Sequence, residues 1–255
     1  MTSNTTGEMP FLDHLEELRW RIIWSLAAVI VGIGAGVGVV MLTPFMDWLE
    51  RPIMPYLPDH KLVFTHPGDP FSIVMQASVG LGLLIALPVV LFQVWGFLAP
   101  ALYKSERRIG LAVVAGAVLL FIAGAAMGFM VVLPLAIPWL MDFGKGWLTP
   151  MITASEYFGF AFSLTLAFGV AFELPVVLLG LSALGVVSTE MLIRFRRHAL
   201  VAAVVIGAFL TPGDLLWTTI AMAVPLYLLY EISILLSYFV ARRRRKAEAA
   251  RMAEG

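Results

Sequence analysis

The sequence of 255 residues contains no cysteine and few charged side chains, since only 13% are Asp, Glu, Lys or Arg. The absence of cysteine excludes disulfides, thiolate metal sites and cysteine nucleophiles. The formal net charge is zero, so no overall positive field favours nucleic acid as a partner. Hydrophobic residues make up 60% of the chain, against about 45–50% in an ordinary soluble domain. The mean hydropathy of +0.92 therefore predicts a membrane protein.

Sequence motifs of several enzyme classes are also missing. There is no GxxxxGK[ST] loop for nucleotide phosphates, no HExxH zinc motif and no GxSxG nucleophile elbow. Ser163, Ser182 and Ser233 lie in apolar runs without a histidine at similar depth, and such serines usually bond the backbone or a neighbouring helix. We therefore disfavour an intramembrane serine hydrolase and expect no catalytic residue, metal or cofactor.

Long apolar runs predict an all-α, polytopic membrane protein with six transmembrane helices. The residues before the first run are acidic as well as basic, so we expect no cleaved signal peptide. Pro88, Pro175 and Pro225 lie inside runs and predict kinked helices that form a concave bundle. The predicted spans cover residues 22–43, 71–97, 109–133, 157–183, 199–211 and 215–240.

Two features of these runs concern helix length. The third run is expected to end at Pro134 and Pro138, because proline interrupts a helix. The fifth run has about 13 residues, which cover only about 20 Å as a helix. We therefore expect short fifth and sixth helices, joined by the turn of residues 211–214, that thin the bilayer locally.

The distribution of basic residues predicts the orientation. Of the 17 lysines and arginines, 14 lie on the side that holds the two termini and the second and fourth loops. By the positive-inside rule this side is cytoplasmic, which places the protein in a bacterial inner membrane with both termini inside. We expect residues 1–240 to form a single membrane domain and residues 241–255 to form a basic cytoplasmic tail that contacts anionic lipid headgroups.

Two acids lie within the predicted spans. Glu173 precedes Leu174-Pro175 in the fourth span, where a charge costs at least a few kcal/mol. One interpretation is a protonated carboxyl bonded to a carbonyl that Pro175 frees; the other is a polar contact for a substrate or a partner helix. Glu231 in the sixth span is about ten residues from Arg242 and is compatible with partial hydration near the cytoplasmic face.

Other acids gather on the cytoplasmic side. The apolar stripe of Phe11, Leu15, Leu18 and Ile22 predicts an amphipathic surface helix that continues into the first span. Its acids include Glu17, which lies beside a negatively charged membrane surface and is therefore unfavourable unless a cation binds. The alternative is an i,i+4 pair between Glu17 and Arg21. Glu106 stands beside two arginines in the second loop, where a weak surface ion pair is the simplest interpretation, so by itself it indicates little about function.

Four segments carry a family resemblance. FLDHLEELRWRI at residues 11–22, QVWGFLAPALYKSERR at 93–108, FGVAFELPV at 168–176 and LTPGD at 210–214 stand in this order along nearly the whole chain. Together they resemble TatC, the polytopic subunit of the twin-arginine protein translocase.

The resemblance implies a receptor for folded export substrates whose signal peptides carry two consecutive arginines. It implies transport driven by the proton-motive force, assembly with other copies and recruitment of single-span partners of the TatA/TatB type. The signal-peptide site falls on Glu17, Glu106 and Phe97. The intramembrane glutamate falls on Glu173, facing a concave groove, with Pro52 and Asp214 at other functional positions.

One position departs from that pattern. Thr218 stands four residues after Asp214, where a longer amide such as glutamine is expected. Any partner contact that needs an amide there is therefore in doubt. Intramembrane polar contacts to a partner would then involve Glu173, Thr218 and Glu231.

The chemistry of the acids agrees with this interpretation. Each guanidinium fork of an arginine pair is best matched by a carboxylate in bidentate geometry, which lysine cannot reproduce. Glu17 and Glu106, from separate segments, would meet two arginines at once. A rival function is a proton-coupled small-solute transporter with Glu173 as proton carrier, which requires a water-filled site and several facing polar residues.

Overall fold

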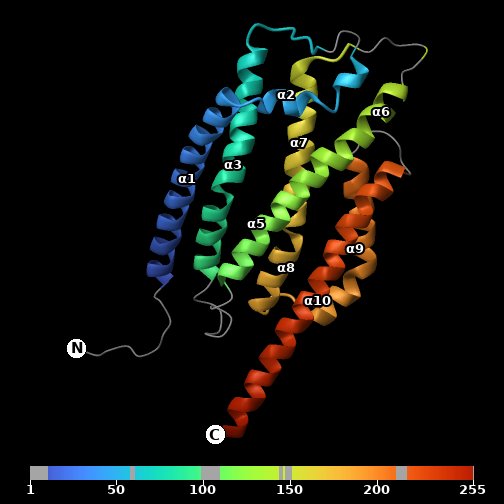
Figure 1. Cartoon of the computed structure of the whole chain (residues 1–255). Coiled ribbons are helices and arrows are strands. Elements are labelled where there is room, and N and C mark those ends of the chain that lie inside the picture. Colours follow the sequence, from blue (N-terminus) through green and yellow to red (C-terminus); the bar gives the residue numbers. More distant parts are fainter. Residues whose placement is uncertain are drawn as a thin grey trace.

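The computed structural model describes residues 11–57, 61–98, 110–143, 146, 151–210 and 217–254 (Figure 1). These residues form an all-helical bundle without strands; their one isolated β-bridge joins Val63 and Thr153. This confirms the all-α class. The elements are α1 (Phe11–Leu42), α2 (Phe45–Glu50), the 3-10 turn η1 (Met54–Tyr56), α3 (Asp69–Leu98), α5 (Gly110–Met127), the π-helical turn η3 (Gly128–Val132), α6 (Leu133–Phe143), α7 (Ala154–Phe172), α8 (Leu174–Ala183), α9 (Thr189–Leu210) and α10 (Trp217–Glu254).

Helices long and apolar enough to cross a membrane account for most of the bundle. Among the described residues there are five such segments, and α9 is not one of them because it begins with Glu190 and three arginines. The chain is therefore a multi-pass membrane protein. The five candidate spans are Leu15–Leu42, Asp69–Phe97, Gly110–Asp142, Ala154–Ala183 and Met222–Phe239.

The predicted end of the third helix at Pro134 is wrong. The helix continues from α5 through η3 into α6 and ends at Phe143, with Pro138 inside α6. A proline ring clashes with the carbonyl four residues earlier and lacks an N–H. The wider π-helical turn immediately before Pro134 relieves both problems, so the helix passes both prolines.

Pro175 has the predicted effect on the fourth helix. The helix is interrupted at Glu173, which is both the C-cap of α7 and the N-cap of α8. Pro88 and Pro225 lie inside α3 and α10, which continue through them. Proline therefore divides one helix of this bundle and is accommodated within others.

The last two helices are longer than predicted. α9 has 22 residues and α10 has 38. Their charged ends extend the helices beyond the apolar runs. The expectation of short fifth and sixth helices is therefore wrong for the helices themselves, and local thinning of the bilayer stays a prediction.

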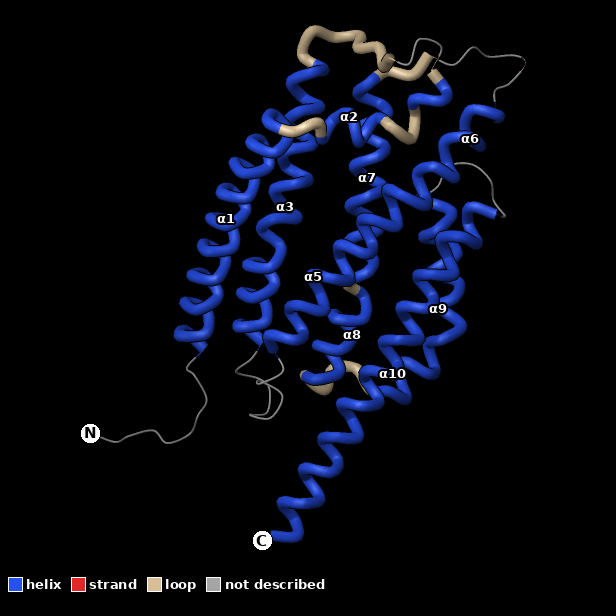
Figure 2. Tube along the Cα trace, in the orientation of Figure 1, coloured by secondary structure: helices blue, strands red, loops and turns tan. Residues whose placement is uncertain are grey.

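Helices α1 and α3 lie side by side along most of their length (Figures 1 and 2). Small residues make this possible. A Cβ placed on Gly32 would stand 2.4 Å from the Gly82 carbonyl oxygen, and one on Gly36 would stand 2.3 Å from the Ser78 carbonyl oxygen. Without a hydrophobic driving force in lipid, close backbone approach supplies the van der Waals contact that joins two helices. This packing fixes the register of α1 on α3.

The core lies toward the end of the bundle where α2 and η1 cover the helices. Buried side chains of α7 meet those of η3 and α6 there, with Phe158 and Phe168 at most 2% exposed. The Tyr157 hydroxyl donates a 2.6 Å hydrogen bond to the Leu49 carbonyl and ties α2 to α7. The beginning of α1 lies at the opposite end, and α10 extends beyond the bundle at that same end (Figure 2).

Candidate functional site

An ion pair on the first helix anchors the candidate peptide site. Arg21 Nε donates a 2.9 Å hydrogen bond to Oε1 of Glu17, and its Nη2 forms a salt bridge to the same oxygen. The two residues stand one turn apart on α1, so the i,i+4 spacing aligns their side chains on one face. The side chain of Glu17 is 22% exposed and that of Arg21 is 23% exposed. The i,i+4 pair foreseen in the sequence is therefore present.

The same guanidinium crosses to the third helix. Arg21 Nη1 lies 3.4 Å from the backbone oxygen of Gln93 and 3.4 Å from its side-chain Oε1. Phe97 follows Gln93 by one helical turn and is half-buried near the end of α3. Glu17 and Phe97, which are 80 positions apart in the sequence, thus belong to helices that Arg21 joins at one end of the bundle.

Two predicted site residues, Glu106 and Asp214, lie outside the described residues. The described chain on either side of Glu106 ends at Leu98 of α3 and resumes at Gly110 of α5. Both of these points lie at the end of the bundle where α1 begins (Figure 1). The helices that flank the Glu106 segment therefore end where α1 begins, while the contact between Glu17 and Glu106 stays a prediction.

Glu173 occupies the junction of α7 and α8. Its backbone N–H points to the carbonyls of Val170 and Ala171, and its carbonyl accepts 3.0 Å bonds from the N–H groups of Val176 and Val177. The side chain is half-buried. Its Oε1 is shielded from solvent and has no hydrogen-bond partner among the residues that the structure describes. A carbonyl freed by Pro175 therefore does not satisfy this oxygen.

Glu231 is paired in the structure. Arg196 Nη2 on α9 donates a 2.9 Å bond to Glu231 Oε2, and the Tyr227 hydroxyl donates a 2.8 Å bond to Oε1. The charge of Glu231 is thus compensated within the chain by a neighbouring helix. Thr218 lies in the second position of α10, and its side chain is outside the described set.

Pro52 lies in the covering segment at the opposite end of the bundle. It is half-buried and follows Arg51, the C-cap of α2. Because its φ angle is fixed and it has no N–H, proline suits the exit from a short helix. Its position supports a structural contribution to the cover formed by α2 and η1.

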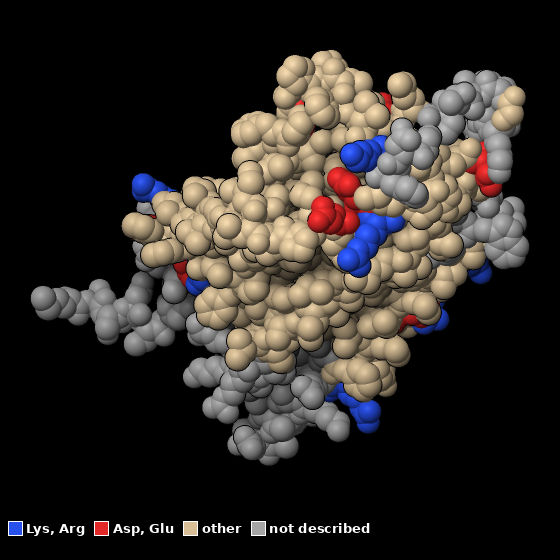
Figure 3. Space-filling model, turned by 45° about the horizontal axis from the view of Figure 1, so that its top comes forward, with Lys and Arg blue, Asp and Glu red and all other residues tan. Residues whose placement is uncertain are grey.

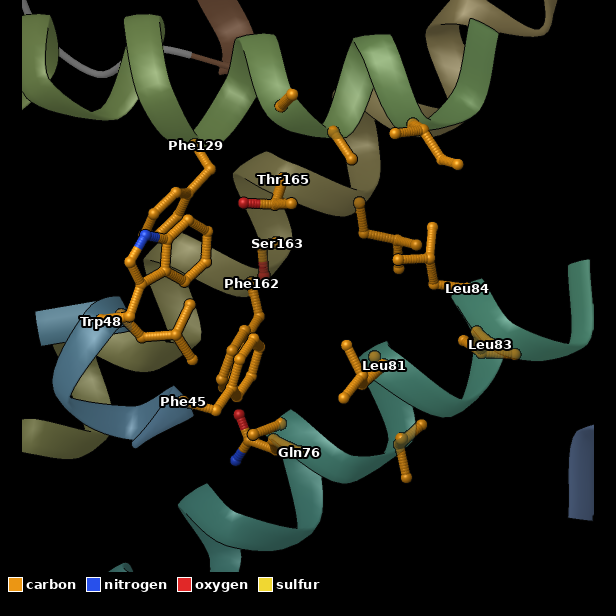
Figure 4. A pocket seen from close by; sticks show the side chains of 18 of the residues that line it. Phe45, Trp48, Gln76, Leu81, Leu83, Leu84, Phe129, Phe162, Ser163 and Thr165 are labelled. Carbon is orange, nitrogen blue, oxygen red and sulfur yellow. The ribbon is translucent and has the colours of Figure 1, made fainter. Parts of the chain in front are cut away.

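A hollow with a volume of about 620 Å³ lies among α2, α3, α5 and α7 (Figure 4). Phe45, Trp48, Phe129 and Phe162 gather at one side of it, and α3 supplies leucines at the other. Gln76, Ser163 and Thr165 are its amide and hydroxyl side chains. Glu173 does not line it, so the predicted groove-facing position of this acid stays a prediction.

The surface in Figure 3 is mostly uncharged, with one group of acidic and basic side chains near its middle and further charged side chains toward its edges. A second hollow of about 360 Å³ is lined by residues that include Glu50 and Lys61. Burial, with a smaller contribution from Asp47, raises the pKa of Glu50 above its ordinary value. This part of the surface therefore combines a mostly uncharged area with a few acidic and basic side chains.

Sequence reasoning missed two residues of the site at the α1–α3 end, Gln93 and Gly96. Gln93 accepts from Arg21, and Gly96 lies so close that a Cβ there would stand 2.1 Å from Arg21 Nη1. The sequence offered one hint, because an amide at position 93 stands one turn before Phe97 in an otherwise apolar run. Arg21 itself was considered only as a partner for Glu17.

Comparisons with known proteins agree with the fold. The family model described as Sec-independent protein translocase protein (TatC) matches residues 13–225. TatC of Aquifex aeolicus is 39% identical over 95% of this chain and 100% of its own length. TatCy of Bacillus subtilis is 33% identical over 98% of this chain and 97% of its own length.

Two solved structures are also similar. One is described as the crystal structure of the twin-arginine translocase receptor TatC, with a TM-score of 0.73 and 39% identity over 89% of this chain and 99% of that one. The other, described as the same receptor in DDM, has a TM-score of 0.75 and 39% identity over 88% of this chain and 99% of that one. The family consists of protein translocase components, which are transport proteins rather than enzymes. With the family model, the full-length relatives and the fold in agreement, this chain belongs to the TatC family of Sec-independent protein translocases, the multi-pass membrane subunits of the bacterial twin-arginine system.

Proposed function

We propose that this protein is the receptor and core subunit of a twin-arginine translocase, which binds the signal peptides of folded cargo proteins at its cytoplasmic face. Glu17, Glu106 and Phe97 form the peptide site in this proposal. The observation that carries it is the bridge from Glu17 through Arg21 to Gln93, which joins the segments bearing Glu17 and Phe97. A half-buried carboxylate at such a place is suited to a second guanidinium.

The orientation belongs to the same proposal. All six helical runs cross a bacterial inner membrane, including the apolar part of α9 after His198, and both termini are cytoplasmic. The beginning of α1 and the end of α10 lie at one end of the bundle, which supports this topology. The arginines near the start of α9 and at the end of α10 belong to that end, as the positive-inside rule requires.

Partner recruitment involves different residues. TatA/TatB-type single-span proteins, other copies of the chain and membrane lipids are the proposed partners, and the proton-motive force drives transport. Glu173, Thr218 and Glu231 serve polar contacts within the membrane, and Pro52 and Asp214 act at the opposite end. The shielded, unbonded oxygen of Glu173 supports a contact that an incoming group completes, because an unsatisfied polar atom in lipid is costly.

The rival function requires a polar, water-filled midplane site. The hollow among α2, α3, α5 and α7 is instead lined by aromatic and aliphatic side chains, with Gln76, Ser163 and Thr165 as the amide and hydroxyl exceptions. Glu231 is engaged by Arg196 and Tyr227. These observations favour an apolar ligand over a small polar solute.

Retention on an immobilised Arg-Arg signal peptide tests the receptor function, with a Lys-Lys peptide for comparison. Glu17→Gln and Glu106→Gln are each expected to weaken binding by about 1.5–3 kcal/mol, the range for a hydrogen bond to a charged group. Glu16→Gln is the matched control, because Glu16 is an exposed acid on the same helix. Equal retention of the parental protein and both variants would contradict the proposal.

Glu173→Ala separates binding from later steps. It is expected to leave peptide retention intact and to reduce transport of a folded reporter into inverted vesicles that hold a proton-motive force. Loss of initial binding would overturn the assignment of the arginine pair to Glu17 and Glu106. Transport at the parental rate would reduce Glu173 to a tolerated buried acid.

A further inference from the structure

Arg21 is the same chemical group as the proposed ligand, and it already occupies Glu17. Its Nε donates to Glu17 Oε1 at 2.9 Å and its Nη2 bonds the same oxygen. On the other side, Nη1 reaches two oxygens of Gln93 at 3.4 Å. One guanidinium therefore bonds acceptors on two helices, and its bonds to the Glu17 carboxylate are shorter than those to Gln93.

The third helix is shaped to receive this guanidinium. A Cβ on Gly96 would stand 2.1 Å from Arg21 Nη1 and 2.8 Å from Cζ, so a larger residue there would have to displace the end of the Arg21 side chain from this position. Glycine inside a helix costs about 0.5–1 kcal/mol relative to alanine. That cost is offset where a side chain must lie directly against the helix backbone. Gly96 thus leaves room for the Arg21 guanidinium against α3, one residue before Phe97.

We propose that Arg21 is an internal competitor for the signal peptide, a positioning residue that holds Glu17 in place until an incoming guanidinium displaces it. The inference rests on the proposed function of Glu17. Since a carboxylate accepts one bidentate guanidinium fork at full strength, two guanidinium groups cannot both have the best geometry at Glu17. The displaced Arg21 keeps its acceptors on Gln93 across the helix interface.

The direction of the effect follows from this competition. Removing Arg21 removes the cost of displacement, so Arg21→Met is expected to bind an Arg-Arg signal peptide more tightly than the parental protein. The expected gain in affinity for the peptide is about five-fold, which corresponds to the upper end of the range of interaction energies for a partly exposed ion pair. Discrimination between Arg-Arg and Lys-Lys peptides is expected to stay constant, because both peptides displace the same group.

The experiment is a titration of the detergent-solubilised, full-length protein with a fluorescent Arg-Arg signal peptide. The matched control is Arg194→Met, which removes an exposed arginine of α9 at the same end of the bundle and is expected to leave the Kd unchanged. Arg21→Gln serves as a second variant, because it also removes the charge but keeps amide donors for the Gln93 carbonyl. It is expected to tighten binding in the same direction if Arg21→Met does not fold.

A double variant separates competition from simple charge repulsion. In a Glu17→Gln background, Arg21→Met is expected to leave the Kd unchanged, because no carboxylate remains to compete for. An equal gain with and without Glu17 would overturn the inference and assign the effect to long-range electrostatics. Unchanged or weaker binding by both Arg21 variants would overturn it too, leaving the receptor function intact, whereas a parental protein without a preference for Arg-Arg would overturn both.

Discussion

The two sides of this bundle join their helices by different means. On one side, α1 and α3 bring their backbones into contact through Gly32, Gly36 and Gly82. On the other, α8, α9 and α10 are linked by hydroxyls, because Ser237 lies 2.7 Å from Ser182 Oγ and 3.0 Å from Thr189 Oγ1.

The comparison shows two solutions to the same physical problem. Lipid removes the hydrophobic drive between helices, so association depends on van der Waals contact or on interhelical hydrogen bonds. Glycine contact gives a dense interface whose register cannot shift without a backbone clash. Hydroxyl contact ties helices at points and leaves the rest of the interface to ordinary side-chain packing. The side with fixed register carries the Glu17–Arg21–Gln93 arrangement.

The largest expected effect comes from breaking the glycine side. Gly82→Ala places a Cβ about 2.5 Å from Ile33 Cα, a backbone atom that cannot yield locally. We expect a loss of about 1–3 kcal/mol in the free energy of unfolding, the range for overpacking. Reversible unfolding by SDS in mixed micelles measures it.

Gly80→Ala is the matched control on the same helix, because a Cβ at that position meets nothing within 4 Å. It is expected to be neutral or to stabilise by up to about 1 kcal/mol through helix propensity. Equal effects of the two substitutions would show that α1 and α3 are not held by close approach at Gly82.

A smaller effect is expected on the hydroxyl side. Ser237→Ala removes the group that contacts both Ser182 and Thr189, and we expect a loss of about 1 kcal/mol, within the range for interhelical bonds in membranes. Ser233→Ala is the control, since Ser233 is equally buried but bonds the Leu229 carbonyl of its own helix. The same unfolding assay compares the two variants. A larger loss of unfolding free energy for Ser233→Ala would contradict the conclusion that the Ser237 hydroxyl joins these helices.

The smallest effect is expected for the ion pair between α9 and α10. Arg196 and Glu231 are 46% and 28% exposed at their side chains, so solvent screens their attraction. Their coupling energy in a double-variant cycle of Arg196→Met and Glu231→Gln should stay below about 1 kcal/mol. A coupling several times larger would mean that this pair, rather than the Ser237 hydroxyl, joins the two helices.

Much of the fold could be predicted because apolar runs and proline positions are local properties of the sequence. The break at Glu173 before Pro175 followed from such a rule. The same rule failed at Pro134, because a π-helical turn relieves the clash between the proline ring and the preceding carbonyl. No local sequence pattern predicts such a turn. The length of α9 was underestimated because hydropathy ignores the charged turns that extend a helix into the headgroup region.

The candidate site was predictable in part for the same reason. The pair of Glu17 and Arg21 depends only on spacing along one helix, and it is present. The contacts of Arg21 with Gln93 and with the space at Gly96 depend on the register of two helices. That register is set by glycines more than ten residues away, at positions 32, 36 and 82, so no pattern near the site reveals it.

The uninterrupted helix of residues 110–143 has a geometric consequence. Its apolar part, Gly110–Asp142, has 33 residues, or about 50 Å, against a hydrocarbon core of about 30 Å. Such a rod must lean, and α5 and α6 run diagonally across their upright neighbours in Figure 1. A tilted helix beside upright helices contacts them at one depth in the membrane and lies farther from them at another. The apolar hollow lined by α3, α5 and α7 lies beside this slanting helix, so a change in the tilt of the helix would alter the width of the hollow along its whole length, whereas a change in one lining side chain would alter it at one depth.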